Sequence, residues 1–405
     1  MTAPTLRTGP RPLPLHVAVQ TLTWLSSLAA LGPWRNGSLP WRPELAAQAA
    51  GVRARLNAVD PDAFAAALDR ESRRRMAAFA DGVVAYRRHP QRRRRAEAPR
   101  VWCQGSSRLL DYGSAGGAPL LLVPSLVNRA DILDLSEKRS LAAALAGSGF
   151  RPFLMDWGVP RDGERDLTLG DYVSGRLESA LEAVVDLAGR PAGVIGYCMG
   201  GLLAVALAQR RPESVAALAL MATPWDFHAP GGARPRLLEA MAPGIALLLD
   251  TLGFLPVDVL QAMFAGLDPH LTAAKFRRFA AYGADSERAR RFVTLEDWVN
   301  DGVPLAGPVA RECLLGWYVD NTPQRLAWRV QGRAVLPAEV EAPSLVIIPG
   351  ADRIVPPASA AALADALEGA ERWQLAAGHV GMVVGGGAPR MLYEPLAGWL
   401  EKVLR

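Results

Sequence analysis

The hydrophobic and polar positions of the 405-residue chain follow two rhythms. Over residues 43–88, apolar residues recur at three- and four-residue spacing, which predicts helices with a break at 59–62. After Arg100 the pattern changes to short aliphatic runs that alternate with amphipathic segments. Such alternation is typical of a mostly parallel α/β sheet with right-handed crossovers.

The second rhythm predicts the elements of an α/β core in order. A hairpin comes first, at 101–113, and strands separated by helices follow at 118–128, 150–158, 191–198 and 214–224. The alternation stops after Trp225, where the pattern becomes helical and irregular. It resumes with strands at 342–352 and 371–381 and a final helix at 389–404. We therefore expect a helical cap inserted between two parts of one sheet.

These changes of pattern predict four segments. They are an N-terminal helical, arginine-rich extension (1–100), the first part of the core (101–226), the cap (227–335) and the second part of the core (336–405). Residues 1–42 are rich in Pro, Trp and Arg and are interpreted as an arm with one short helix. The apolar stretch at 15–34 contains His, Gln, Thr and Ser, so it predicts a packing or interfacial helix rather than a membrane span or a signal peptide.

Composition narrows the class of protein. Half of the residues are hydrophobic and 21% are charged, which is typical of a soluble globular protein. Three cysteines in a chain of this length form no disulfide framework, so a reducing compartment is expected.

The net charge of +5 is unevenly spread, because arginines gather at 70–75 and 87–95. Runs of this kind can favour nucleic acid, anionic lipid or another polyanion. No aromatic residues are interleaved with them, so we interpret them as a solvated surface and expect no nucleic-acid partner. A weak attraction to anionic surfaces is the alternative.

The clearest chemical motif is Gly196-Tyr197-Cys198-Met199-Gly200, which ends an aliphatic run and begins a helical one. A sharp turn from strand to helix leaves no room for side chains beside the nucleophile, which explains the flanking glycines, including Gly201. The turn would raise the Cys198 sulfur above the sheet edge, at a helix N-terminus that favours a thiolate. A buried cysteine beside a packing glycine is the structural alternative.

An acid and a histidine follow at the expected places. Asp352 stands directly after the aliphatic run at 345–348, and His379 follows the last predicted strand. The order nucleophile, acid, histidine is that of the α/β-hydrolase triad. Cys198 would be the nucleophile, His379 the base, and Asp352 the residue that orients the imidazole. Taken singly, Asp352 could be a helix-capping carboxylate and His379 a surface histidine.

The oxyanion of such a reaction needs two backbone donors. We expect them to be the N–H groups of Met199 and Leu126. The other histidines have no comparable context and no residue spacing suggests a metal. Cys103 and Cys313 are expected to be packing residues.

The motifs resemble those of the polyhydroxyalkanoate synthases. The Gly-Tyr-Cys-Met-Gly-Gly box is similar to that family's lipase-like box, and the segment at 123–135, which ends in Ile-Leu-Asp-Leu, resembles its strand-and-loop signature. Further family motifs are resembled by Trp-Asp-Phe at 225–227, by the Trp-x-x-Asp stretch before a Gly-Pro at 298–308, and by Gly-His-Val-Gly at 378–381. The resemblance covers roughly residues 100–400 and implies an α/β-hydrolase fold.

The resemblance also implies a cytoplasmic acyltransferase without a resident cofactor. It would load a 3-hydroxyacyl group from acyl-coenzyme A onto Cys198 and extend a polyester chain. A homodimer, a partner subunit and a granule surface are left open as partners. Two other functions remain: a cysteine hydrolase of the same fold (depolymerase, thioesterase or esterase) and a non-catalytic granule-associated protein.

Overall fold

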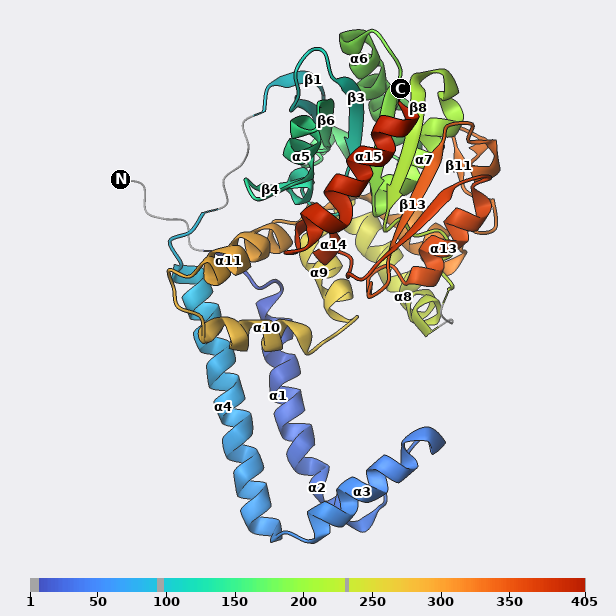
Figure 1. Ribbon diagram of the computed structural model, residues 1–405. Helices are drawn as coiled ribbons and strands as arrows, with labels where there is room; N and C mark the ends of the chain where they lie inside the picture. The colour runs from blue at the N-terminus through green and yellow to red at the C-terminus, as the bar shows by residue number, and fades with distance from the viewer. Residues whose placement is uncertain (1–6, 93–97, 230–232, 405) are drawn as a thin grey trace. The chain divides into compact units, whose positions relative to one another are not determined.

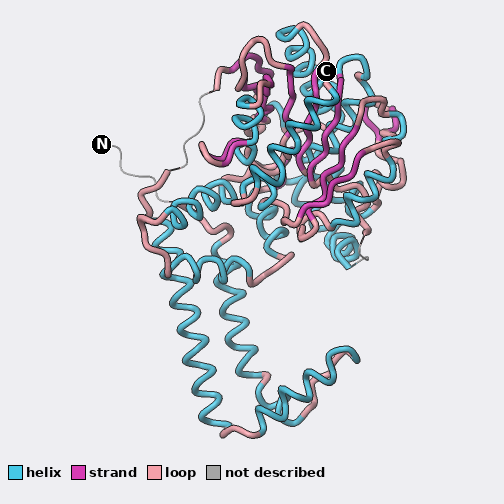
Figure 2. The backbone as a smooth tube through the Cα atoms, in the orientation of Figure 1, coloured by secondary structure: helices cyan, strands magenta, loops and turns pink. Residues whose placement is uncertain are grey.

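The computed structural model describes residues 7–92, 98–229 and 233–404. The chain forms two compact units, Met1–Arg92 with Gln261–Asn300, and Arg93–Leu260 with Asp301–Arg405. In its described residues the first unit contains helices and loops but no strand, whereas the second contains the sheet (Figure 2).

Eight strands form the central sheet of the second unit, in the order β1-β2-β6-β3-β7-β8-β13-β14 (Figure 1). The pairs β1–β2 and β2–β6 are antiparallel, and all pairs from β6 to β14 are parallel. The strands are β1 (Arg100–Gln104), β2 (Ser107–Asp111), β3 (Ala118–Val123), β6 (Phe150–Asp156), β7 (Ala192–Tyr197), β8 (Val215–Met221), β13 (Ser344–Pro349) and β14 (Glu371–Leu375). The predicted α/β-hydrolase fold with a mostly parallel sheet is confirmed.

Helices flank this sheet, as parallel strands require. Every residue of β7 and of β13 is buried, which explains why neither strand contains a charged residue. Helix α7 (Met199–Arg210) is buried from Met199 to Gln209, so it lies in the middle of the unit rather than on its surface. The other flanking helices are α5 (Leu141–Gly147), α6 (Glu178–Ala188), α13 (Pro357–Ala366) and α15 (Glu394–Val403).

The segment predicted as a cap is divided between the two units. Helices α8 (Ala233–Leu252) and α12 (Gly307–Arg311) belong to the second unit, whereas α10 (Leu271–Ala280) and α11 (Glu287–Asn300) group with the N-terminal helices. Helix α9 (Val257–Ala265) crosses the boundary. The four-segment division, including a cap function for 227–335, stays a prediction.

The first unit has its own core. Aromatic and aliphatic residues of α4 (Pro61–Arg88), α10 and α11 form one buried cluster, including Phe79, Tyr86 and Phe276. At Gly82, a Cβ would lie 2.1 Å from the Phe276 carbonyl oxygen, so this glycine lets α4 and α10 approach closely. Tyr86 donates a 2.9 Å hydrogen bond to Asp297 of α11. Helix α3 (Ala46–Asn57) precedes the break before α4, as predicted.

The N-terminal arm differs from its prediction. It contains not one short helix but α1 (Leu13–Ala29), which has 17 residues, and α2 (Leu31–Asn36). Pro14 lies in the first turn of α1, where no backbone N–H is needed, so it starts the helix rather than breaking it. Among the described residues, no helix is both long and apolar enough to cross a membrane.

The first arginine run, at 70–75 in α4, is solvent-exposed at each of its arginines, in agreement with the interpretation of a solvated surface. Arg73 pairs with Asp69, and Arg74 and Arg75 share Glu71. The second arginine run, at 87–95, includes Arg93–Arg95, which lie outside the described residues.

Candidate active site

Cys198 occupies a strained turn between β7 and α7. Its φ and ψ angles are 56° and −127°, a conformation that residues other than glycine rarely adopt. Hydrogen bonds fix the turn on both sides: the Cys198 N–H donates to the Met221 carbonyl at 2.8 Å, and the Gly201 N–H donates to the Cys198 carbonyl at 2.9 Å. The thiol is thus held at the N-terminus of α7, half-buried.

The three glycines of this turn lie against backbone or side-chain atoms. A Cβ on Gly196 would be 2.5 Å from the Gly201 Cα, and one on Gly201 would be 1.9 Å from the Thr223 hydroxyl oxygen. A Cβ on Gly200 would be 2.2 Å from the Val123 carbonyl oxygen, at the end of β3. Gly200 therefore brings the start of α7 against the loop that follows β3.

Asp352 and His379 lie on the loops after β13 and β14. The His379 Nδ1 donates to the Asp352 Oδ2 at 2.7 Å, and both residues are buried. The other carboxylate oxygen of Asp352 accepts from the backbone N–H groups of Ile354 and Val355 at 2.8 and 2.9 Å. One oxygen of Asp352 therefore holds its own loop while the other orients the imidazole.

The structure brings His379 to Cys198 as well. Burial lowers the pKa of His379, but the electrostatic attraction of Cys198 and the hydrogen bonds of the imidazole with Asp352 and Cys198 outweigh burial and raise the pKa of His379 to about 10. The imidazole therefore keeps its proton beside the Cys198 sulfur. This arrangement places a nucleophile and a proton donor in contact.

The loop after β3 carries the second candidate oxyanion donor. The Pro124 carbonyl accepts from the Trp157 indole at 3.0 Å, and the Val127 N–H donates to the Ser125 hydroxyl at 3.2 Å. The Val127 carbonyl accepts from the Val303 N–H at 3.0 Å. Because the Val127 N–H is already engaged, the neighbouring N–H of Leu126 remains the better candidate. The first N–H groups of a helix have no partner within it, which applies to Met199.

Comparisons with known proteins give the family. An α/β hydrolase fold family matches residues 118–385. Poly(3-hydroxyalkanoate) polymerase subunit PhaC of Synechocystis sp. is 33% identical over 293 residues, which cover 70% of this chain and 78% of the relative. The protein of the same name from Allochromatium vinosum is 30% identical, over 70% of this chain and 81% of its own length. This chain belongs to the poly(3-hydroxyalkanoate) polymerase family.

Some members of the family are longer. Poly(3-hydroxyalkanoate) polymerase subunit PhaC of Haloferax mediterranei is 30% identical over 310 residues, and the match spans 63% of that relative. Among solved structures, a monoacylglycerol lipase from Paleococcus ferrophilus is 16% identical, with a TM-score of 0.46 over 73% of this chain and 98% of the lipase.

One residue of this polymerase-family site was missed by the sequence analysis. The Tyr197 ring lies against the His379 ring, with centroids 5.2 Å apart, and its hydroxyl donates to the His379 carbonyl at 3.4 Å. Burial, followed by the negative charges of Cys198 and Asp352, raises the pKa of Tyr197 well above its ordinary value. Its place next to Cys198 in the motif was the only available signal.

The remaining cysteines lie outside the site. Cys313 is buried, and burial raises the pKa of its thiol well above the ordinary value, as suits a packing residue. The prediction that Cys103 is a packing residue is wrong, because β1 is an edge strand and leaves Cys103 exposed. The part of the chain that the structure describes holds no cluster of three His, Cys, Asp or Glu residues suited to a metal ion.

Proposed function

We propose that this chain is a polyhydroxyalkanoate synthase, an acyltransferase that moves 3-hydroxyacyl groups from coenzyme A thioesters to a growing polyester. Family membership supports the reaction class. The observation that carries the assignment of residues is the contact series from Cys198 through His379 to Asp352, in which the last two are joined at 2.7 Å.

In the first half of the reaction, the Cys198 thiolate attacks the carbonyl carbon of the thioester. The negative charge that develops on the carbonyl oxygen is stabilised by the N–H groups of Met199 and Leu126. The tetrahedral intermediate collapses as the carbon–sulfur bond to coenzyme A breaks. His379 gives its proton to the departing sulfur, so free coenzyme A leaves and an acyl thioester remains on Cys198.

In the second half, the hydroxyl of a 3-hydroxyacyl unit attacks the thioester on Cys198. The now neutral His379 takes the hydroxyl proton, while Asp352 stabilises the imidazolium that forms. An ester bond forms and the Cys198 thiolate is released beside protonated His379. Acyl-coenzyme A is a substrate of this reaction. Because no step transfers electrons, the proposed reaction requires no resident cofactor.

The choice between transfer and hydrolysis depends on whether a hydroxyl or water reaches the acyl-enzyme. We propose incubating the full chain with 3-hydroxybutyryl-coenzyme A while following thiol release and the size of the product. A synthase gives polyester, whereas release of free 3-hydroxybutyrate alone would identify a cysteine hydrolase of the same fold. The matched controls are Cys198→Ala, which should release no thiol, and Cys103→Ala, which should behave as wild type.

The relatives bear the name polymerase subunit, which supports a second copy or a partner subunit as part of the active assembly. A granule surface and a cytoplasmic location are consistent with this proposal. Activity measured across a range of protein concentrations would test the need for a second copy. A rate per chain that does not change with concentration would argue against it.

A further inference from the structure

Helix α1 of the first unit turns its polar side chains toward its neighbours. His16, Gln20 and Trp24 are four residues apart and therefore share one face. On this face His16 is only 4% exposed, Gln20 accepts a 3.4 Å hydrogen bond from Arg277 of α10, and the Trp24 indole donates to Asp69 of α4 at 2.9 Å. Polar contacts thus extend along the inner face of α1, while Leu13 in its first turn packs against the core of the first unit.

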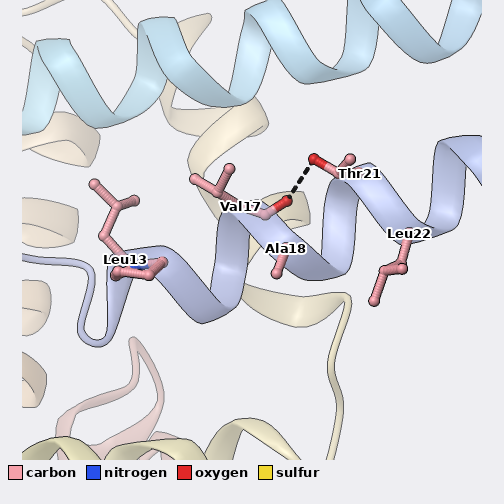
Figure 3. Close-up of a pocket in the computed structure, with 6 residues that line it drawn as sticks. Leu13, Val17, Ala18, Thr21 and Leu22 are labelled. Atoms are coloured by element: carbon pink, nitrogen blue, oxygen red, sulfur yellow. Dashed lines mark hydrogen bonds between the residues drawn. The ribbon is translucent and has the colours of Figure 1, made fainter.

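The outer face of α1 is apolar. Val17, Leu22 and Leu25 are 45%, 64% and 54% exposed. An open groove of about 650 Å³ runs along this face and is lined by Leu13, Pro14, Val17, Ala18, Thr21 and Leu22 (Figure 3). The Thr21 hydroxyl donates to the Val17 carbonyl, which satisfies it within the helix. A surface helix ordinarily buries its apolar face against the rest of its chain. Because α1 leaves its apolar face exposed, we infer that an apolar partner outside the chain covers this face.

The net charge of the first unit indicates the chemistry of that partner. The sequence of the first unit contains 19 Lys and Arg against 11 Asp and Glu, a net charge of +8, whereas the second unit has 26 against 29, a net charge of −3. No residue of α1 is charged. Two copies that met through α1 would bring two strongly positive units together, which opposes self-association. An anionic surface would be attracted instead.

Arginines border α1 along its inner edge. The Arg73 guanidinium lies 4.8 Å from the centre of the Trp24 ring. Burial and then the positive charges of Arg75 and Arg74 lower the pKa of Arg277, which shows that these cations lie near one another. Three of these arginines, Arg73 to Arg75, pair with only two carboxylates, those of Asp69 and Glu71. The group of arginines beside α1 therefore keeps a net positive charge.

We propose that α1 lies in the surface of an anionic phospholipid layer, with its apolar groove among the acyl chains and the arginines of α4 and α10 at the phosphates. Interfacial helices combine these two features. A tryptophan pair beyond the C-terminal end of α1, Trp34 and Trp41 with ring centroids 4.7 Å apart, adds side chains that favour the lipid–water boundary. Nucleic acid would use the arginines but would gain nothing from Val17 or Leu22. The inference does not depend on the proposed catalysis.

The test uses the full chain and vesicles of phosphatidylcholine, either pure or mixed with an equal amount of phosphatidylglycerol. Co-sedimentation should show binding to the mixed vesicles that weakens at high salt, and little binding to the neutral ones. The double variant V17Q/L22Q should bind the mixed vesicles about tenfold more weakly, because two exposed apolar side chains no longer enter the layer. Leu187→Gln is the matched control, since Leu187 is an exposed helical leucine of the second unit.

Arg74→Gln with Arg75→Gln should weaken binding about 30-fold and reduce its dependence on salt, since each arginine near an anionic surface contributes about 1 kcal/mol. The proposal is overturned if wild type binds neither vesicle, if it binds both equally, or if V17Q/L22Q binds like wild type. It is also overturned if sedimentation shows that V17Q/L22Q dissociates a dimer while its vesicle binding is unchanged. Thiol release from acyl-coenzyme A in the absence of vesicles should be the same in all these variants, which separates this test from that of the proposed function.

Discussion

The central sheet of the second unit and helix α1 of the first unit place their hydrophobic residues in opposite ways. In the second unit, strands such as β7 and β13 are covered on both faces by helices of the same chain, and Ile195 and Ile347 are fully buried. In the first unit, α1 is held by polar contacts and leaves Val17, Leu22 and Leu25 exposed. A sheet that is closed on both faces provides a rigid base for catalysis. A helix with an uncovered apolar face provides a surface for binding.

The largest expected effect is a loss of activity caused by substitutions in the second unit but not by substitutions in the first. Cys198→Ala should lower thiol release about 10⁴-fold or more, because the second unit then lacks its nucleophile. Cys198→Ser should also be far weaker than wild type, since His379 must deprotonate a much less acidic group. V17Q/L22Q in the first unit should keep the wild-type rate. Steady-state thiol release measures all three, and substantial activity in Cys198→Ala would remove Cys198 from its role.

Within the second unit, substitutions of His379 and of Asp352 should lower the acylation rate by different amounts. His379→Ala removes both the base and the proton donor, so acylation should fail. Asp352→Ala leaves the imidazole less well oriented and should acylate slowly but measurably. The loss should be smaller than the about 10⁴-fold cost of the equivalent change in a serine triad, because a thiol is intrinsically more acidic than a hydroxyl.

Single-turnover acylation, with mass detection of the adduct on Cys198, separates these two variants. Wild-type acylation and elongation by Asp352→Ala would reduce Asp352 to a carboxylate that only holds its own loop through Ile354 and Val355.

Two glycines at close contacts sharpen the comparison further. Gly82→Ala places a Cβ against the Phe276 carbonyl between α4 and α10, and Gly200→Ala places one against the Val123 carbonyl beside the loop that carries Leu126. Both should be destabilised, by about 1–3 kcal/mol. Only Gly200→Ala should also lower kcat, by about 10²-fold, because one oxyanion donor is displaced. Thermal unfolding together with kcat measures both effects, and an equal loss of kcat in the two variants would contradict the assignment.

The smallest effect is a pH dependence of stability. Because the pKa of His379 is raised from 6.5 to about 10, the folded chain binds this proton more tightly than the unfolded chain does. The resulting stabilisation is complete below pH 6.5, declines as the pH rises above that value, and is lost once the pH passes about 10. The unfolding midpoint of wild type should therefore approach that of His379→Gln over this interval. A constant difference between the two would show that His379 is not held protonated.

Tyr197 gives that measurement a finer control. Tyr197→Phe keeps the ring against His379 and loses only the 3.4 Å hydrogen bond, so its pH profile should stay close to wild type. Tyr197→Leu removes the ring contact and should shift the profile.

The sequence by itself determined the sheet and the order of the candidate site residues. Runs such as residues 345–348 can only be satisfied by burial on both faces, and residues that follow parallel strands must meet at one edge of the sheet. The glycines around Cys198 also pointed to the turn, because only a close approach requires them. Cys198, Asp352 and His379 were therefore accessible to local reasoning.

Tertiary structure alone decided the rest. Periodicity shows that α1 is a helix but not which face meets its neighbours, and here polar contacts from α4 and α10 selected the His16 side. Exposure of Cys103 followed from the position of β1 at the sheet edge. The contact of Tyr197 with His379 joins the end of β7 to the loop after β14, which is distant in sequence. The physical reason is common to all three. Local pattern limits which residues can be buried, but only long-range packing decides which atoms bury them.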